Sequence, residues 1–302
     1  MAQLIEYEER RLYEAEQAMP EKDRWENLTI QNSFMFAKVM SNEELCTELL
    51  RRIFPDLNIG YVQIVQTEKA FETGWDSRGI RLDVYAESGQ RIFDAEMQAQ
   101  NTHTLPKRSR YYHGTIDVTN LEKGLDYDEL RDTYVIFICP FDPFTAGRHL
   151  YTFRNLCTED PSLELKDGTT TVFLNASGLI DDVSPKLKAF LDYVSGSPAS
   201  KIGDDFVEKL EEHLDRARKN KDWRREFMMG SIYERDAYLR GENKGLEKGR
   251  EEGREEGRQE ILSAIIAKLK SSGISVPEIN ELLEGYCTVN EDVAGFLVAK
   301  KE

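Results

Sequence analysis

The sequence has few cysteines and no long apolar run, and each shortage excludes a class of protein. The four cysteines, Cys46, Cys139, Cys157 and Cys287, have no C-x-x-C spacing, which favours reduced thiols over a disulfide framework or zinc ligation through Cys157 or His149. No stretch approaches the roughly 18 consecutive apolar residues of a membrane span. The N-terminus lacks the apolar segment of a signal peptide. We therefore expect a folded, cytoplasmic protein with no membrane partner.

An excess of basic charge is also missing, because the formal net charge of the 302 residues is −16. A chain this acidic has no broad attraction for nucleic acid, since phosphate contacts need clustered Lys and Arg. The exception is 101–116, a stretch without any acidic residue. It predicts a DNA-binding patch in which Lys107, Arg108 and Arg110 hold phosphate and Tyr111 stacks or hydrogen-bonds. The alternative is an amphipathic helix whose tyrosines face the core.

The most informative segment is 81–98, RLDVYAESGQRIFDAEMQ, whose alternating pattern predicts two strands joined by a Ser-Gly turn. For a loop with an even number of residues, Asp83 lies opposite or diagonal to Asp94 and Glu96, and Gln98 shares their face. Carboxylates this close repel one another unless a hard cation such as Mg²⁺ lies between them. From the pattern alone, a surface hairpin with solvated acids is the commoner arrangement. Asp94 is expected to be a solvated or hydrogen-bonded neighbour.

The pattern of apolar residues from 3 to 240 predicts an α/β fold. The expected elements are a helix at 3–26, helices within 28–54 that break at 41–42, strands at 61–71, 80–86, 91–98 and 134–139, a helix at 106–121, short strands at 149–153 and 170–175, and helices at 184–194 and 203–240. Ser41 followed by Glu44 is a capping box, which predicts a helix start there. This order predicts a mixed sheet buried between helices, extended by the two short strands.

The C-terminal part contains an internal repeat with a glycine at positions 241, 245, 249, 253 and 257. Each glycine costs a helix about 0.8–1.0 kcal/mol relative to alanine, whereas neighbouring ion pairs recover only about 0.2–0.5 kcal/mol each. The segment is therefore either a half-helical spacer or a helix paired with a copy of itself, which would make a homo-oligomer. We expect three regions: a core at 1–198, a charged helical segment at 199–260 and a small helical module at 261–302.

Asp83, followed by a turn and Glu96-Met97-Gln98, resembles the PD-(D/E)XK nuclease motif, with Gln98 where most members carry lysine. The chain is also similar, from about residue 28 to 193, to the Rpn family of recombination-promoting nucleases, also labelled transposases. Four blocks in the same order carry this likeness: NSFMF at 32–36, RLDV at 81–84, PKRSRYY at 106–112 and YVIFIC at 134–139.

The resemblance implies a restriction-endonuclease-like core and cleavage of DNA that depends on Mg²⁺, with Mn²⁺ as a substitute, in recombination or mobile-element biology. It implies that Asp83 and Glu96 are catalytic metal ligands and that Gln98 orients a water. Asn32 stands where many relatives have an aspartate, which leaves the third acidic ligand open. A competing hypothesis is a catalytically degenerate nuclease fold that serves as an interaction module. A third is a true transposase, which must also join strands.

Overall fold

The computed structural model describes residues 12, 16–17, 19–71, 79–283, 288–289 and 297–298. The chain divides into two compact units, Met1–Met229 and Gly230–Glu302. In the described residues, no helix is both long and apolar enough to cross a membrane.

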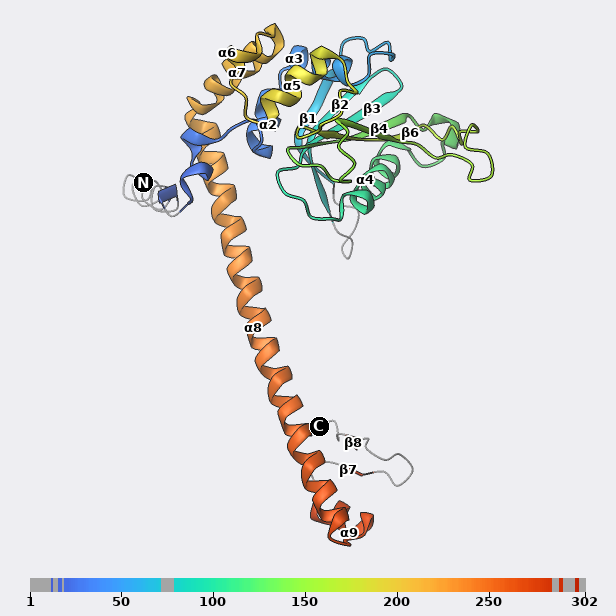
Figure 1. Ribbon diagram of the computed structural model, residues 1–302, viewed down its shortest axis with the longest axis vertical. Helices are drawn as coiled ribbons and strands as arrows, with labels where there is room; N and C mark the ends of the chain where they lie inside the picture. Colours follow the sequence, from blue (N-terminus) through green and yellow to red (C-terminus); the bar gives the residue numbers. More distant parts are fainter. Residues whose placement is uncertain are drawn as a thin grey trace. The chain divides into compact units, whose positions relative to one another are not determined.

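A mixed sheet with the strand order β1-β2-β3-β4-β6-β5 forms the centre of the first unit (Figure 1). Its strands are β1 (Gln63–Phe71), β2 (Ile80–Ser88), β3 (Arg91–Met97), β4 (Asp132–Cys139), β5 (Leu150–Phe153) and β6 (Thr169–Asn175). β1, β2 and β3 are antiparallel neighbours, β3, β4 and β6 run parallel, and β5 is antiparallel to β6. The predicted α/β fold with an extended mixed sheet is therefore confirmed.

Helices cover both faces of this sheet. Helix α4 (Leu105–Asn120) lies on one face, and α2 (Ser33–Met40), α3 (Glu43–Ile53) and α5 (Pro185–Val194) lie on the other (Figure 1). β4 is covered on both sides, because Ile136 and Ile138 enter the core under α2 whereas Val135 and Phe137 enter the core under α4. Such a strand reads as a continuous apolar run, which explains why YVIFIC was predictable.

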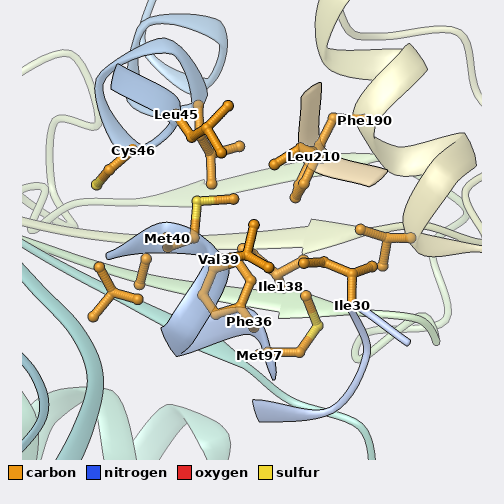
Figure 2. Packing of buried hydrophobic residues seen from close by; sticks show 14 of the residues in the cluster. Ile30, Phe36, Val39, Met40, Leu45, Cys46, Met97, Ile138, Phe190 and Leu210 are labelled. Atoms are coloured by element: carbon orange, nitrogen blue, oxygen red, sulfur yellow. The ribbon is translucent and has the colours of Figure 1, made fainter. Parts of the chain in front are cut away.

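The core under α2 fixes the start of that helix near the end of β3. Figure 2 shows Phe36 of α2 beside Met97 of β3 and Ile138 of β4, and all three side chains are buried. Helix α6 (Ala199–Ile202) and helix α7 (Asp205–Arg218) follow α5, and α7 adds Phe206, Val207, Leu210, Leu214 and Ala217 to this core.

Two predicted features near the N-terminus differ from the structure, one in full and one only at its end. Helix α3 is capped by Asn42, whose side chain accepts the Leu45 N–H at 3.0 Å, and Ser41 instead donates to Lys38 O of the preceding helix. Asparagine and serine are equally good caps, so adjacent candidates cannot be separated locally. Of the predicted helix at 3–26, residues 12, 16 and 17 are helical, the end forms short 3₁₀ helices, η1 (Glu21–Asp23) and η2 (Trp25–Asn27), and most of the rest lies outside the described residues.

The predicted helix at 203–240 is two helices. Helix α7 ends at Arg218, and α8 (Lys221–Ser271) begins after Asn220, whose side chain accepts the N–H groups of Asp222 and Trp223. Helix α8 then continues without a break through all five repeated glycines.

The end of the second unit contains both helix and strand. Helix α9 (Val276–Leu282) starts at a capping box formed by Ser275 and Glu278, and Ile279 packs on Ile266. The short strands β7 (Thr288–Val289) and β8 (Leu297–Val298) pair antiparallel, so the helical expectation at Leu297 is wrong.

Candidate active site

Strands β2 and β3 part at one end, and the two motif acids lie where they part. The ladder between the strands ends at the pair Val84 and Ala95. Beyond it, the Asp83 N–H donates to Glu96 Oε1 at 2.8 Å, and the Met97 N–H donates to Asp83 Oδ2 at 3.0 Å. Each carboxylate thus binds a backbone N–H of the opposite strand, which brings the two acids together as the hairpin pattern predicts.

Helix α4 adds a cation to these acids. Arg108 Nη2 donates to Glu96 Oε2 at 3.0 Å, and Arg108 Nη1 donates to Gln98 Oε1 at 2.6 Å. The hydroxyl of Tyr112, one helical turn later, accepts from Arg108 Nε at 3.0 Å and Nη2 at 2.7 Å. The amide of Gln98 is engaged at its other end too, because its Nε2 donates to Gln100 O at 2.9 Å.

The other residues of the predicted DNA-binding patch do not join this cluster. Lys107, Arg110 and Tyr111 are exposed on α4, whereas Arg108 is half-buried and Tyr112 is buried. The structure therefore brings one of the three predicted cations to the acids. Sequence reasoning missed Tyr112, although its spacing of four residues from Arg108 on a helix puts the two side chains side by side.

Asp94 differs most from expectation. Its side chain is fully buried, so the prediction of a solvated acid is wrong; the carboxyl group beside it is that of Glu96, with which it can share a proton. Asp94 pairs with Tyr85 in β2 and lies two residues before Glu96, on the face that α4 covers. Burial makes this carboxyl costly to ionise, so we expect Asp94 to keep its proton beside Glu96.

Burial dominates the electrostatics of the three acids. It raises the pKa of Asp83 well above the usual range, and the neighbouring Glu96 raises it further. Burial raises the pKa of Asp94 likewise, with added repulsion from Glu96 and Asp83. The pKa of Glu96 is raised by burial too, against the opposing effects of the Asp83 N–H and the Arg108 guanidinium. The cluster holds more acid groups than nearby cations, and added positive charge would favour their ionised forms.

Asp83 and Glu96 line a cavity of about 380 Å³. Its lining includes Asn32, Arg81, Asp83, Glu96, Gln98 and Arg108. Asn32 is also the cap of α2, because its side chain accepts the Met35 N–H at 3.1 Å. The position where an additional acid was expected therefore faces the same cavity as the two motif acids. A larger cavity, between α3 and α7, does not include these acids.

The donor chemistry of the cavity suits a hard divalent cation. In the part of the chain that the structure describes, no three His, Cys, Asp or Glu side chains are arranged to hold a metal ion. The cavity does offer the carboxylates of Asp83 and Glu96, together with the amide groups of Asn32 and Gln98. Oxygen donors of this kind are the ligands that Mg²⁺ and Mn²⁺ prefer, and two carboxylates with waters are enough for Mg²⁺.

A protein-family model matches the part of the chain that contains the site. The family model described as PD-(D/E)XK nuclease family transposase matches residues 32–185, just over half of the chain. The match begins at Asn32, the cap of α2, and contains the whole six-stranded sheet and α4. No curated protein and no solved structure was found to match.

Proposed function

Since the chain belongs to the PD-(D/E)XK nuclease family transposases, with a nuclease- or transposase-like domain, we propose that it is a divalent-metal-dependent DNA endonuclease. The observation that supports this most is the meeting of Asp83 and Glu96 where β2 and β3 part, beside a cavity that Asn32, Gln98 and Arg108 also line. The reaction proposed is hydrolysis of a phosphodiester bond, in recombination or mobile-element activity.

In this proposal Asp83 and Glu96 hold Mg²⁺, or Mn²⁺ in its place. Each accepts one backbone N–H, and a carboxylate has about four lone-pair sites, so both keep capacity for a cation. When bound, the ion supplies positive charge to the phosphate and makes water more acidic. The water oxygen forms a bond to phosphorus, the bond from phosphorus to one sugar oxygen breaks, and a proton lost by the water is balanced by one gained at that sugar oxygen.

The chain's own residues would orient the DNA. Lys107 and Arg110 are exposed on the helix that carries Arg108, so they can hold phosphates on either side of the cleaved one. Tyr111, which is 40% exposed, is placed to stack on or hydrogen-bond to the backbone. These contacts are local, because a net charge of −16 gives no general attraction to DNA.

The test is nicking of supercoiled plasmid with Mg²⁺ or Mn²⁺ by the full-length protein. Asp83→Asn and Glu96→Gln keep an oxygen that can accept the backbone N–H but remove the charge that binds metal. We expect each to slow nicking by at least about 100-fold, more than the usual effect of a residue behind the ligands. Asp128→Asn, at an exposed carboxylate of the 3₁₀ helix η3 (Tyr127–Glu129), is the matched control and should nick normally. Nicking by Asp83→Asn at the wild-type rate would reject the proposal.

A second candidate function is a non-catalytic interaction module that forms homo-oligomers through α8. Asn32 and Gln98 favour it, because both are neutral where the family commonly has charge. Calorimetric titration with Mn²⁺ separates the two functions: a nuclease binds the ion and loses it on Asp83→Asn, whereas an interaction module has no reason to bind it. Strand joining by a true transposase requires its own assay, since hydrolysis alone does not demonstrate it.

A further inference from the structure

The position that carries lysine in most PD-(D/E)XK nucleases holds Gln98, and its amide is already bonded at both ends. Its Oε1 accepts from Arg108 Nη1 at 2.6 Å, and its Nε2 donates to Gln100 O at 2.9 Å. This amide is uncharged, so it cannot stabilise the negative charge of a phosphate as a lysine would. The guanidinium to which it is bonded does carry one, and it lies 3.0 Å from Glu96 Oε2.

We propose that Arg108 is the catalytic cation of this site and that Gln98 and Tyr112 are positioning residues, which hold the guanidinium beside Glu96. This inference rests on the proposed nuclease function. It assigns Gln98 a role different from the orientation of water, and it separates Arg108 from Lys107 and Arg110, which hold DNA without touching the acids.

The hydrogen bonds of Arg108 leave one donor for a substrate. A guanidinium has five N–H donors. Its Nε–H binds Tyr112, the two Nη2 hydrogens bind Glu96 and Tyr112, and one Nη1 hydrogen binds Gln98. Among the residues that the structure describes, the second Nη1 hydrogen has no partner, and it lies on the edge of the guanidinium next to Gln98. The Arg108 side chain is 33% exposed and lines the cavity, so this donor is within reach of a phosphate oxygen placed there.

The ring contacts of Arg108 fix the plane of its guanidinium. Its Cζ lies 5.1 Å from the ring centre of Tyr112 and 5.6 Å from that of Phe137, which are both buried. A cation held by two rings and by four hydrogen bonds needs little rearrangement when charge develops on a phosphate, which is how fixed donors accelerate reactions. An arginine also keeps its charge at any working pH. The cavity therefore contains the cation that Gln98 does not provide.

A double-mutant cycle on plasmid nicking tests this assignment, because Gln98 should act only through Arg108. Arg108→Ala is expected to lower kcat about 10²–10³-fold, as the loss of a fixed donor does, with a much smaller change in KM. Gln98→Ala should lower kcat about 10–100-fold in the otherwise wild-type protein and no further in the Arg108→Ala background. If Gln98 orients a water by itself, the two losses multiply, and the inference is overturned.

Gln98→Lys provides a second test, because it should lower kcat when Arg108 is present and raise kcat when Arg108 is absent. Gln98→Lys introduces a second cation beside the Nη1 of Arg108, so it should slow the protein that retains Arg108. In the Arg108→Ala background the same substitution restores a charge near Glu96 and should raise kcat. A Gln98→Lys protein that is faster than wild type while Arg108 is present would contradict the proposal.

Tyr112→Phe keeps the buried ring and removes the hydroxyl that accepts two N–H groups of Arg108. We expect kcat to fall about 10–100-fold without a change in the circular dichroism spectrum. If Arg108→Ala does not fold, the kcat of Tyr112→Phe and of Arg108→Lys tests the role of Arg108 in its place. An unchanged kcat for Tyr112→Phe would remove Tyr112 from the assignment. Arg154→Ala, at an exposed arginine paired with Glu164, is the matched control and should nick normally.

The outcomes separate this inference from the proposed function. If the wild-type protein does not nick, or nicks independently of Asp83, both the nuclease function and the role of Arg108 are rejected. If nicking depends on Asp83 but the losses from Gln98→Ala and Arg108→Ala multiply, only the role of Arg108 is rejected.

Discussion

His113, a buried histidine of α4, links the stability of the fold to pH. Its Nδ1 lies 2.7 Å from Thr133 Oγ1 on β4, and its Nε2 lies 3.0 Å from Thr171 Oγ1 on β6. A hydroxyl can donate or accept, so the neutral ring is satisfied at both nitrogens. Burial lowers the pKa of His113 from 6.5 to about 4, since the charged ring would lose its hydration.

This shift predicts a loss of stability on acidification. The folded pKa lies below the unfolded one, so the stabilisation is fully present above about pH 6.5 and is lost as the pH falls toward 4. At pH 5 the loss is about 2 kcal/mol, from 1.36 kcal/mol per pKa unit. The raised pKa values of Asp83 and Asp94 act in the opposite direction, because these acids protonate more readily in the folded protein. The effect of His113 must therefore be measured as a difference between two proteins.

The comparison protein is His113→Gln, which keeps a group that donates and accepts but does not titrate. Urea unfolding at pH 7.5 and pH 5 should show that the wild-type protein loses about 2 kcal/mol more than His113→Gln between the two pH values. His103→Asn is the control, because His103 is exposed and its φ of 54° is one that asparagine tolerates. Equal pH dependence in the wild type and His113→Gln would refute the reasoning.

Two further substitutions test the tail helix and the start of α2. Gly249 lies in α8 where an added Cβ meets nothing within 4 Å, so Gly249→Ala should stabilise the helix by about 0.8–1.0 kcal/mol, measured by thermal unfolding in circular dichroism. A lower melting temperature would contradict this. Asn32→Asp keeps an oxygen for the Met35 N–H and adds charge at the cavity, so Mn²⁺ affinity in calorimetry should rise several-fold. Unchanged affinity would place the ion away from Asn32.

The sheet and the meeting of Asp83 with Glu96 could be predicted because both follow from local alternation. A strand repeats every two residues, so a turn of known length determines which side chains face one another. The register of Val84 with Ala95 agrees with that reasoning. Alternation alone does not indicate a role for these acids. The resemblance to the Rpn family supplied the prediction that they bind a metal ion.

The features that escaped prediction depend on contacts between segments distant in the sequence. Alternation places Asp94 and Glu96 on one face, but α4 decides that this face is buried, so the burial of Asp94 could not be foreseen. Likewise, three cations in 107–110 look equivalent until packing turns Arg108 alone toward the acids. In the tail, the propensity cost of glycine left open a half-helical spacer or a helix paired with a copy of itself, and α8 is continuous through the repeat.

The reciprocal hydrogen bonds where β2 and β3 part give Asp83 and Glu96 a role in the stability of the fold as well. Each accepts a buried N–H that the separated strands no longer pair, and leaving such a group unmatched costs about 1–3 kcal/mol. A related chain without nuclease activity would still lose stability if either carboxylate were replaced. Retention of the acid pair is therefore poor evidence of activity among related chains, whereas the role proposed for Arg108 predicts that its replacement by an uncharged residue accompanies loss of activity.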